Sequence, residues 1–73
     1  MPRQRPMFSG TRARRFRTER DLSREQVAVA VGRSAETVQL WELGHHAPPM
    51  PMVWRLAEVL DVHPVDLFVG GDR

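Results

Sequence analysis

The pattern of apolar and polar positions predicts helices along most of this 73-residue chain. The clearest example lies in the C-terminal half, where Val53, Leu56, Ala57 and Leu60 recur at intervals of three and four residues. At about 100° per residue, this spacing places the four side chains on one face of a helix. We therefore expect an amphipathic helix over residues 51–60, with this face directed into a core.

Residues 22–44 predict two short helices joined by a tight turn. Ser23 is suited to cap the first helix, and Gln26, three residues on, is suited to complete a capping box. Gly32 and Gly44 follow the two helical patterns and can adopt the left-handed conformation in which many helices end. Helices connected by so short a turn must cross at a large angle. The expected helices span residues 24–31 and 35–43.

The second of these helices has two distinct sides. Helical periodicity places Val38, Trp41 and Glu42 on one side, and residues such as Gln39 and Leu40 on the other. We expect Trp41 to be buried and Glu42 to help hold the fold, so that this side fastens the helix to the core. The opposite side is then free to contact another molecule.

The rest of the chain supplies the boundaries of the domain. Residues 1–8 contain two prolines, two arginines and no helical periodicity, which predicts a flexible basic arm. The next segment predicts a helix that buries Ala13 and Phe16, and Pro64 is placed to start a short final helix. The expected single domain covers residues 9–69, its outer helices cover residues 10–20 and 64–69, and residues 70–73 form a tail.

Composition narrows the range of functions. The chain contains no cysteine, which excludes disulfide bonds and thiolate metal sites. No apolar run approaches the roughly 20 residues of a membrane-spanning helix, and we expect no signal segment. His45 and His46 are adjacent and His63 lies in another segment, so we expect no metal site. The expected protein is cytoplasmic, is not an enzyme and needs no cofactor.

Charge is distributed unevenly along the sequence. All eleven basic residues are arginines, and the formal net charge is only +2. Residues 1–20 contain seven arginines and one glutamate, which gives +6, whereas residues 21–73 carry −4. Such a run commonly forms a solvated surface, but a positive field concentrated at one end of a chain also favours a polyanionic partner.

Several motifs stand in a characteristic order along the chain. They are Leu22-Ser23, Val27-Ala28, Gly32, Ser34, Val38, Trp41-Glu42-x-Gly44, Leu56-Ala57-x-x-Leu60-x-Val62 and Asp66-Leu67-Phe68. In this order and spacing, over about residues 9–68, the sequence resembles the phage-repressor-like (Cro and C1 type, XRE) family of helix-turn-helix domains. The resemblance implies an all-α fold, a compact five-helix lambda-repressor-like domain.

The same resemblance implies a function and a set of contact residues. It implies a sequence-specific transcriptional regulator, a repressor, that binds double-stranded DNA as a homodimer, with residues 35–43 in the major groove. It also implies an ion pair between Arg17 and Glu42. Residues at the helix N-termini would contact phosphates, and the outward side of the second helix would meet the bases. The expected DNA-binding residues are Ser23, Arg24, Arg33, Ser34, Ala35, Glu36, Thr37, Gln39 and Leu40.

A second interpretation remains open, in which the same scaffold is a protein–protein interaction module, such as an antitoxin. The helix expected over residues 35–43 contains no arginine or lysine. A cluster of exposed apolar side chains suits a protein partner better than a polyanion. The candidate contact residues are Leu40, Leu43, Met50 and Met52. The two interpretations differ in their response to salt, because binding to DNA weakens steeply as salt rises.

Overall fold

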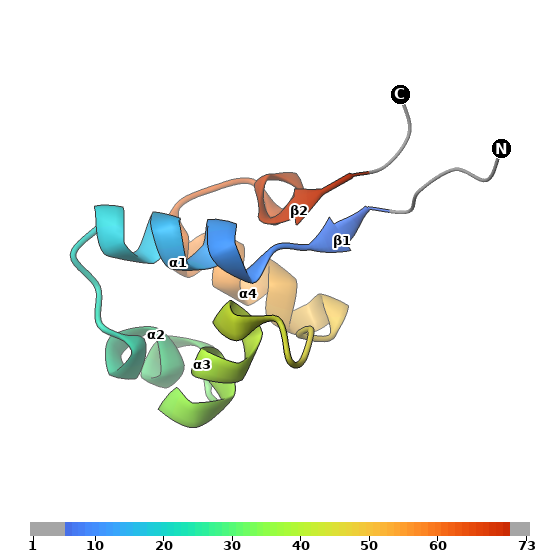
Figure 1. The fold of residues 1–73 in the computed structure, drawn as a ribbon. Helices are drawn as coiled ribbons and strands as arrows, with labels where there is room; N and C mark the ends of the chain where they lie inside the picture. The colour runs from blue at the N-terminus through green and yellow to red at the C-terminus, as the bar shows by residue number, and fades with distance from the viewer. Residues whose placement is uncertain (1–5, 71–73) are drawn as a thin grey trace, which may run out of the picture.

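Helices form most of the protein in a computed structural model that describes residues 6–70 (Figure 1). Four α-helices, one 3-10 helix and two short strands account for the regular structure of this part of the chain. In chain order they are β1 (Met7–Phe8), α1 (Gly10–Glu19), α2 (Arg24–Val31), α3 (Ala35–Leu43), α4 (Met50–Leu60), η1 (Pro64–Leu67) and β2 (Phe68–Val69).

The ends of α2 and α3 have the geometry that their sequences favour. The Ser23 hydroxyl accepts a hydrogen bond from the Gln26 N–H at 3.0 Å, and the Ser23 N–H donates to the Gln26 side chain at 2.7 Å. This reciprocal pair satisfies two backbone N–H groups at the start of α2. Gly32 and Gly44 end the two helices with φ of 75° and 80°, which a residue without Cβ adopts without steric cost.

The segment after α4 differs from the helix expected over residues 64–69. Only Pro64–Leu67 is helical, as the 3-10 helix η1, and the chain then extends into β2. β2 pairs with β1 in antiparallel register, Met7 opposite Val69 and Phe8 opposite Phe68. The two phenylalanine rings meet edge to face, with centroids 6.3 Å apart, a favourable aromatic geometry. The mostly helical fold is therefore confirmed, whereas the count of five helices is not: the last expected helix is a short 3-10 helix, and the described residues also contain a two-stranded sheet.

The expected N-terminal arm also requires correction at its C-terminal end. Met7 and Phe8 belong to the sheet, and Phe8 is half-buried against the core. The Ser9 N–H continues this attachment by donating to the Leu67 carbonyl at 2.7 Å. Residues 1–5 of the expected arm and residues 71–73 of the expected tail lie outside the described residues.

The core lies between the four α-helices and is closed by η1. It contains only small and branched aliphatic side chains apart from Trp41 and Met52. None of the helices within residues 6–70 is long and apolar enough to cross a membrane. The buried apolar residues are Ala13, Val27, Ala28, Val31, Val38, Trp41, Met52, Val53, Leu56, Ala57, Leu60 and Leu67.

Gly10 allows a close approach between the start of α1 and the end of α3. A Cβ at this position would overlap the backbone carbonyl oxygens of Trp41 and Glu42. Only glycine therefore permits this spacing, because backbone atoms cannot move aside as a flexible side chain can. The contact links the position of α3 to the N-terminal end of the domain.

Candidate nucleic-acid interface

The turn between α2 and α3 is fixed by backbone and side-chain hydrogen bonds. The Arg33 N–H donates to the Ala28 carbonyl at 2.9 Å, across the left-handed Gly32. Ser34 then caps α3 by accepting a hydrogen bond from the Thr37 N–H at 3.1 Å. The helices α2 and α3 pack directly on one another, so the turn presents α3 as the second helix of a helix-turn-helix.

The inward side of α3 is the side that helical periodicity predicts. Val38, Trp41 and Glu42 are buried, and Trp41 is only 3% exposed. Glu36 and Gln39 are exposed on the opposite side. This opposite side is therefore available for contact with another molecule.

The buried carboxylate of Glu42, on the inward side of α3, is bound by two arginines from other helices. The Arg17 Nε donates to Glu42 Oε2 at 2.6 Å, and its Nη2 donates to Oε1 at 3.2 Å. The Arg24 Nε donates to the same Oε1 at 3.0 Å. Arg17 also donates to the Leu22 carbonyl at 2.8 Å. This network joins α1, α2 and α3.

The energetic role of this network differs from that of a surface ion pair. A buried pair contributes little net stability, because desolvation offsets the attraction, but removal of one partner typically costs about 3–5 kcal/mol. Both Arg17 and Glu42 are buried. The network therefore makes the domain intolerant of any change that leaves one of these charges alone.

Arg24 has a partner that the sequence did not predict. We expected it to contact phosphates, but its Nε is bound to Glu42. About a third of its side chain is still exposed. The two residues are 18 positions apart, and only the crossing angle of α2 and α3 brings them together. No signal in the sequence pattern indicates this pair.

A polar cleft of about 490 Å³ lies between the N-terminal end of α2 and the outward side of α3. We refer to it as the α2–α3 cleft. It brings together five of the nine residues that the resemblance implies for DNA binding, and it adds Arg17 and Glu25. The lining residues are Arg17, Ser23, Arg24, Glu25, Ala35, Glu36 and Gln39.

The other four expected DNA-binding residues lie outside the lining of this cleft. Arg33 and Ser34 are exposed at the turn, and the Arg33 guanidinium donates to the Gly32 carbonyl at 2.8 Å. Thr37 is half-buried, and its hydroxyl lies 3.0 Å from that of Ser34. Leu40 is also half-buried. Thr37 and Leu40 thus present less surface than we expected.

The apolar residues considered for a protein partner do not share one environment. Met52 is buried, with 7% of its surface exposed, so the expectation that it contacts a partner was wrong. Met52 adjoins Val53 in the first turns of α4, where the core-facing stripe is wider than the sequence spacing indicates. Leu43 and Met50 are exposed.

Among residues 6–70, no group of three or more histidine, cysteine or acidic side chains is arranged to bind a metal ion.

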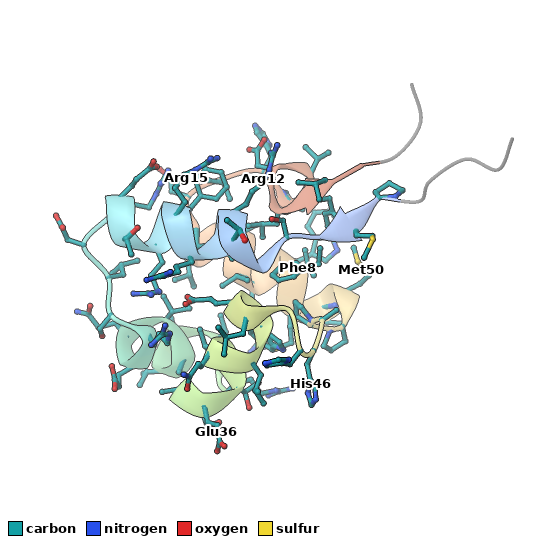
Figure 2. The ribbon with its side chains drawn as sticks, viewed as in Figure 1. Phe8, Arg12, Arg15, Glu36, His46 and Met50 are labelled. Carbon is teal, nitrogen blue, oxygen red and sulfur yellow. The ribbon has the colours of Figure 1, made fainter. Side chains whose placement is uncertain are left out.

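Part of the basic charge of α1 lies away from the outward side of α3. Figure 2 shows Arg12 and Arg15 at the edge of the molecule opposite Glu36. Arg12 donates to the Asp66 carbonyl at 3.4 Å, and Arg15 lies 3.9 Å from a Glu19 carboxylate oxygen and over the Phe16 ring. The positive charge of the first helix therefore does not line the α2–α3 cleft, except through Arg17.

Comparisons with known proteins place the chain in a family. A profile described as a helix-turn-helix domain matches residues 10–68, and the chain belongs to this family. An uncharacterised HTH-type transcriptional regulator of Archaeoglobus fulgidus is 32% identical over 63 residues, covering 86% of this chain and 90% of the relative. A second regulator of that organism, with the same description, is 29% identical over 59 residues, covering 81% of this chain and 83% of the relative.

Solved structures give the same assignment. The restriction-modification controller protein C.AhdI from Aeromonas hydrophila is 34% identical, with a TM-score of 0.77 over 81% of this chain and 89% of that chain. The DNA-binding domain of the P22 C2 repressor is 24% identical, with a TM-score of 0.79 over 92% of this chain and 84% of that chain, and shows likeness of fold alone. The resemblance to the Cro and C1 type is confirmed, and these comparisons support a DNA-binding transcriptional regulator.

Proposed function

We propose that this protein is a sequence-specific transcriptional regulator, a repressor, that reads the major groove of DNA with α3. The orientation of α3 carries the proposal. Its Trp41 side is buried and its Glu36 and Gln39 side is exposed beside the N-terminal end of α2. In the helix-turn-helix mode of binding, this is the side that enters the groove.

The proposed contacts fall into two groups. Ser23, Arg24, Arg33 and Ser34 contact phosphates, because free backbone N–H groups and positive dipoles at helix N-termini favour anions. These contacts fix the register of the protein on the duplex without reading its sequence. Ala35, Glu36, Thr37, Gln39 and Leu40 face the base edges, with Thr37 and Leu40 contributing only their exposed parts.

The proposed active form is a homodimer on a two-fold site. A single α3 spans only a few base pairs, and two copies related by a two-fold axis double the number of contacted bases. The two half-sites should be separated by about one helical turn, roughly 34–36 Å between centres. C.AhdI is named as a controller protein, and the Archaeoglobus fulgidus relative that is 32% identical is named as an HTH-type transcriptional regulator, which supports the proposed regulatory role.

Selection of bound duplexes from a random pool tests this proposal. We expect a palindromic consensus with half-sites about one helical turn apart. Recovery of a consensus without internal symmetry would contradict the dimer but not the DNA-binding role. Failure to enrich any sequence, even at low salt, would contradict the function itself and would favour the protein-interaction alternative, which the comparisons do not favour.

A further inference from the structure

The outward side of α3 lacks the side chain most often used to read DNA. The helix contains two glutamates but no arginine, lysine or histidine. It therefore cannot make the arginine–guanine contact that is the commonest specific contact in the major groove. Its exposed polar side chains are Glu36 and Gln39, which are three residues apart and line the α2–α3 cleft.

Glu36 differs from the other glutamate of α3 in its surroundings. The Glu42 carboxylate accepts hydrogen bonds from Arg17 and Arg24. Among residues 6–70, the Glu36 side chain has no hydrogen-bond or ion-pair partner, and Figure 2 shows it pointing away from the body of the molecule. An ionised carboxylate carries only acceptor oxygens, so Glu36 requires a donor from any molecule that occupies the cleft.

The major groove offers few suitable donors. Guanine presents N7 and O6 and thymine presents O4, all of which are acceptors and repel a carboxylate. Only cytosine N4 and adenine N6 carry amino groups. In an A·T pair, N6 lies between two acceptors, adenine N7 and thymine O4, whereas in a G·C pair N4 has an acceptor on one side only, guanine O6. Cytosine is therefore the base that suits a carboxylate best.

We infer that Glu36 is a specificity-determining residue that selects cytosine at one position of each half-site, by accepting a hydrogen bond from its N4 amino group. The inference rests on the proposed DNA-binding function. An acidic side chain in a groove lined by phosphates is repelled by them, so it is tolerated best where a base donates a hydrogen bond to its carboxylate. Glu36 then disfavours binding to guanine and thymine, whose acceptors repel its carboxylate, as well as favouring binding to cytosine.

The chain contains a matched control for this inference. Glu25 and Glu36 each follow an N-cap serine by two positions, both are exposed, and both line the α2–α3 cleft. An acidic residue in the first turn also stabilises a helix through its dipole, so both substitutions, Glu25→Gln and Glu36→Gln, remove equivalent charge and equivalent helix stabilisation. Only Glu36 lies on α3.

The experiment is duplex selection with the wild-type protein and both variants, followed by affinity measurements on duplexes that differ at the selected position. For the wild type, we expect cytosine at one position of each half-site, preferred over the other bases by about tenfold. Glu36→Gln should lose this preference or shift it to adenine, with which glutamine pairs through two hydrogen bonds. Glu25→Gln should keep the cytosine preference, although its affinity for all duplexes should rise.

Three results would overturn the inference. Equal, uniform increases in affinity for both variants, with unchanged base preference, would mean that Glu36 contributes charge alone. A wild-type consensus with no conserved cytosine would also contradict it while leaving the DNA-binding function intact. If the wild type selects no duplex at all, the proposed function fails together with the inference. Thermal unfolding of both variants establishes that the folded domain is being compared.

Discussion

The two tryptophans of this domain have opposite environments. Trp41 is 3% exposed and packs in the core beneath α3, whereas Trp54 is 60% exposed on α4. Truncation of a buried aromatic side chain removes many apolar contacts and leaves a cavity. Truncation of an exposed one removes little that water does not replace.

We therefore expect Trp41→Ala to lower the free energy of unfolding by about 3–5 kcal/mol, a large part of the stability of a small domain. Trp54→Ala should change it by no more than about 0.5 kcal/mol. Urea denaturation followed by circular dichroism measures both values. If the Trp54 variant were the less stable of the two, the assigned orientation of the helices would be wrong.

Single residues also show how far the sequence predicts the site. Helical periodicity alone separates Trp41 from Gln39, because residues on opposite sides of one helix need no knowledge of the rest of the fold. Burial of Met52 and the contact of Arg24 with Glu42 depend instead on which helices pack against each other. The DNA-contacting roles of the residues around α3 remain predictions, since they concern a molecule outside the chain.

At the scale of elements, the helices were predictable and the sheet was not. Capping serines, terminal glycines and apolar spacing mark α2 and α3 within the segment itself. The strands β1 and β2 have two residues each, too few for the alternation that predicts a strand. They form because segments from the two ends of the described chain meet beside the core, a long-range pairing that local patterns do not encode.

The junction of α1 with α3 gives a test at this scale. By helix propensity alone, Gly10→Ala would stabilise the start of α1 by about 0.5–1 kcal/mol. Its Cβ would overlap the carbonyls of Trp41 and Glu42, so we expect a net loss of about 1–3 kcal/mol, the range typical of overpacking. Chemical denaturation should resolve the difference in sign.

Gly44→Ala is the matched comparison for this test. Its Cβ would meet no atom within 4 Å, and the cost should come only from φ of +80°, about 1–2 kcal/mol. In the Gly10 variant, the chemical shifts of residues along α3 should change. In the Gly44 variant, changes should be confined to the C-terminal end of α3. A stabilised Gly10→Ala protein with unmoved α3 would show that the close approach is not needed.

At the scale of the whole molecule, acidic and basic side chains are mixed on the side of the α2–α3 cleft, whereas the opposite edge carries arginines of α1. The α2–α3 cleft contains the acidic Glu25 and Glu36 as well as Arg17 and Arg24, while Arg12 and Arg15 lie at the opposite edge (Figure 2). The net charge is only +2. Long-range attraction to DNA should therefore be modest, and affinity should depend on a few defined phosphate contacts.

This division predicts a moderate salt dependence. With Arg24 and Arg33 from each of two subunits on phosphates, the slope of log K against log salt should be about −4, a loss of roughly a hundredfold between about 50 and 200 mM. Arg24→Gln should reduce this slope by about 2 units per dimer. Arg15→Gln, the control, removes the same charge from the remote edge and should leave the slope unchanged. Equal slopes for all three proteins would exclude Arg24 as a phosphate contact.

The antiparallel pairing of β1 with β2 has a practical consequence for the use of this domain. The backbone enters the fold at Met7 and leaves it at Val69, directly opposite each other in one small sheet. This sheet lies on the side of the molecule away from α2 (Figure 1). A fluorescent reporter fused before β1 or after β2 would be attached beside this sheet. A short linker that joins the end of β2 to the start of β1 would close the backbone into a ring.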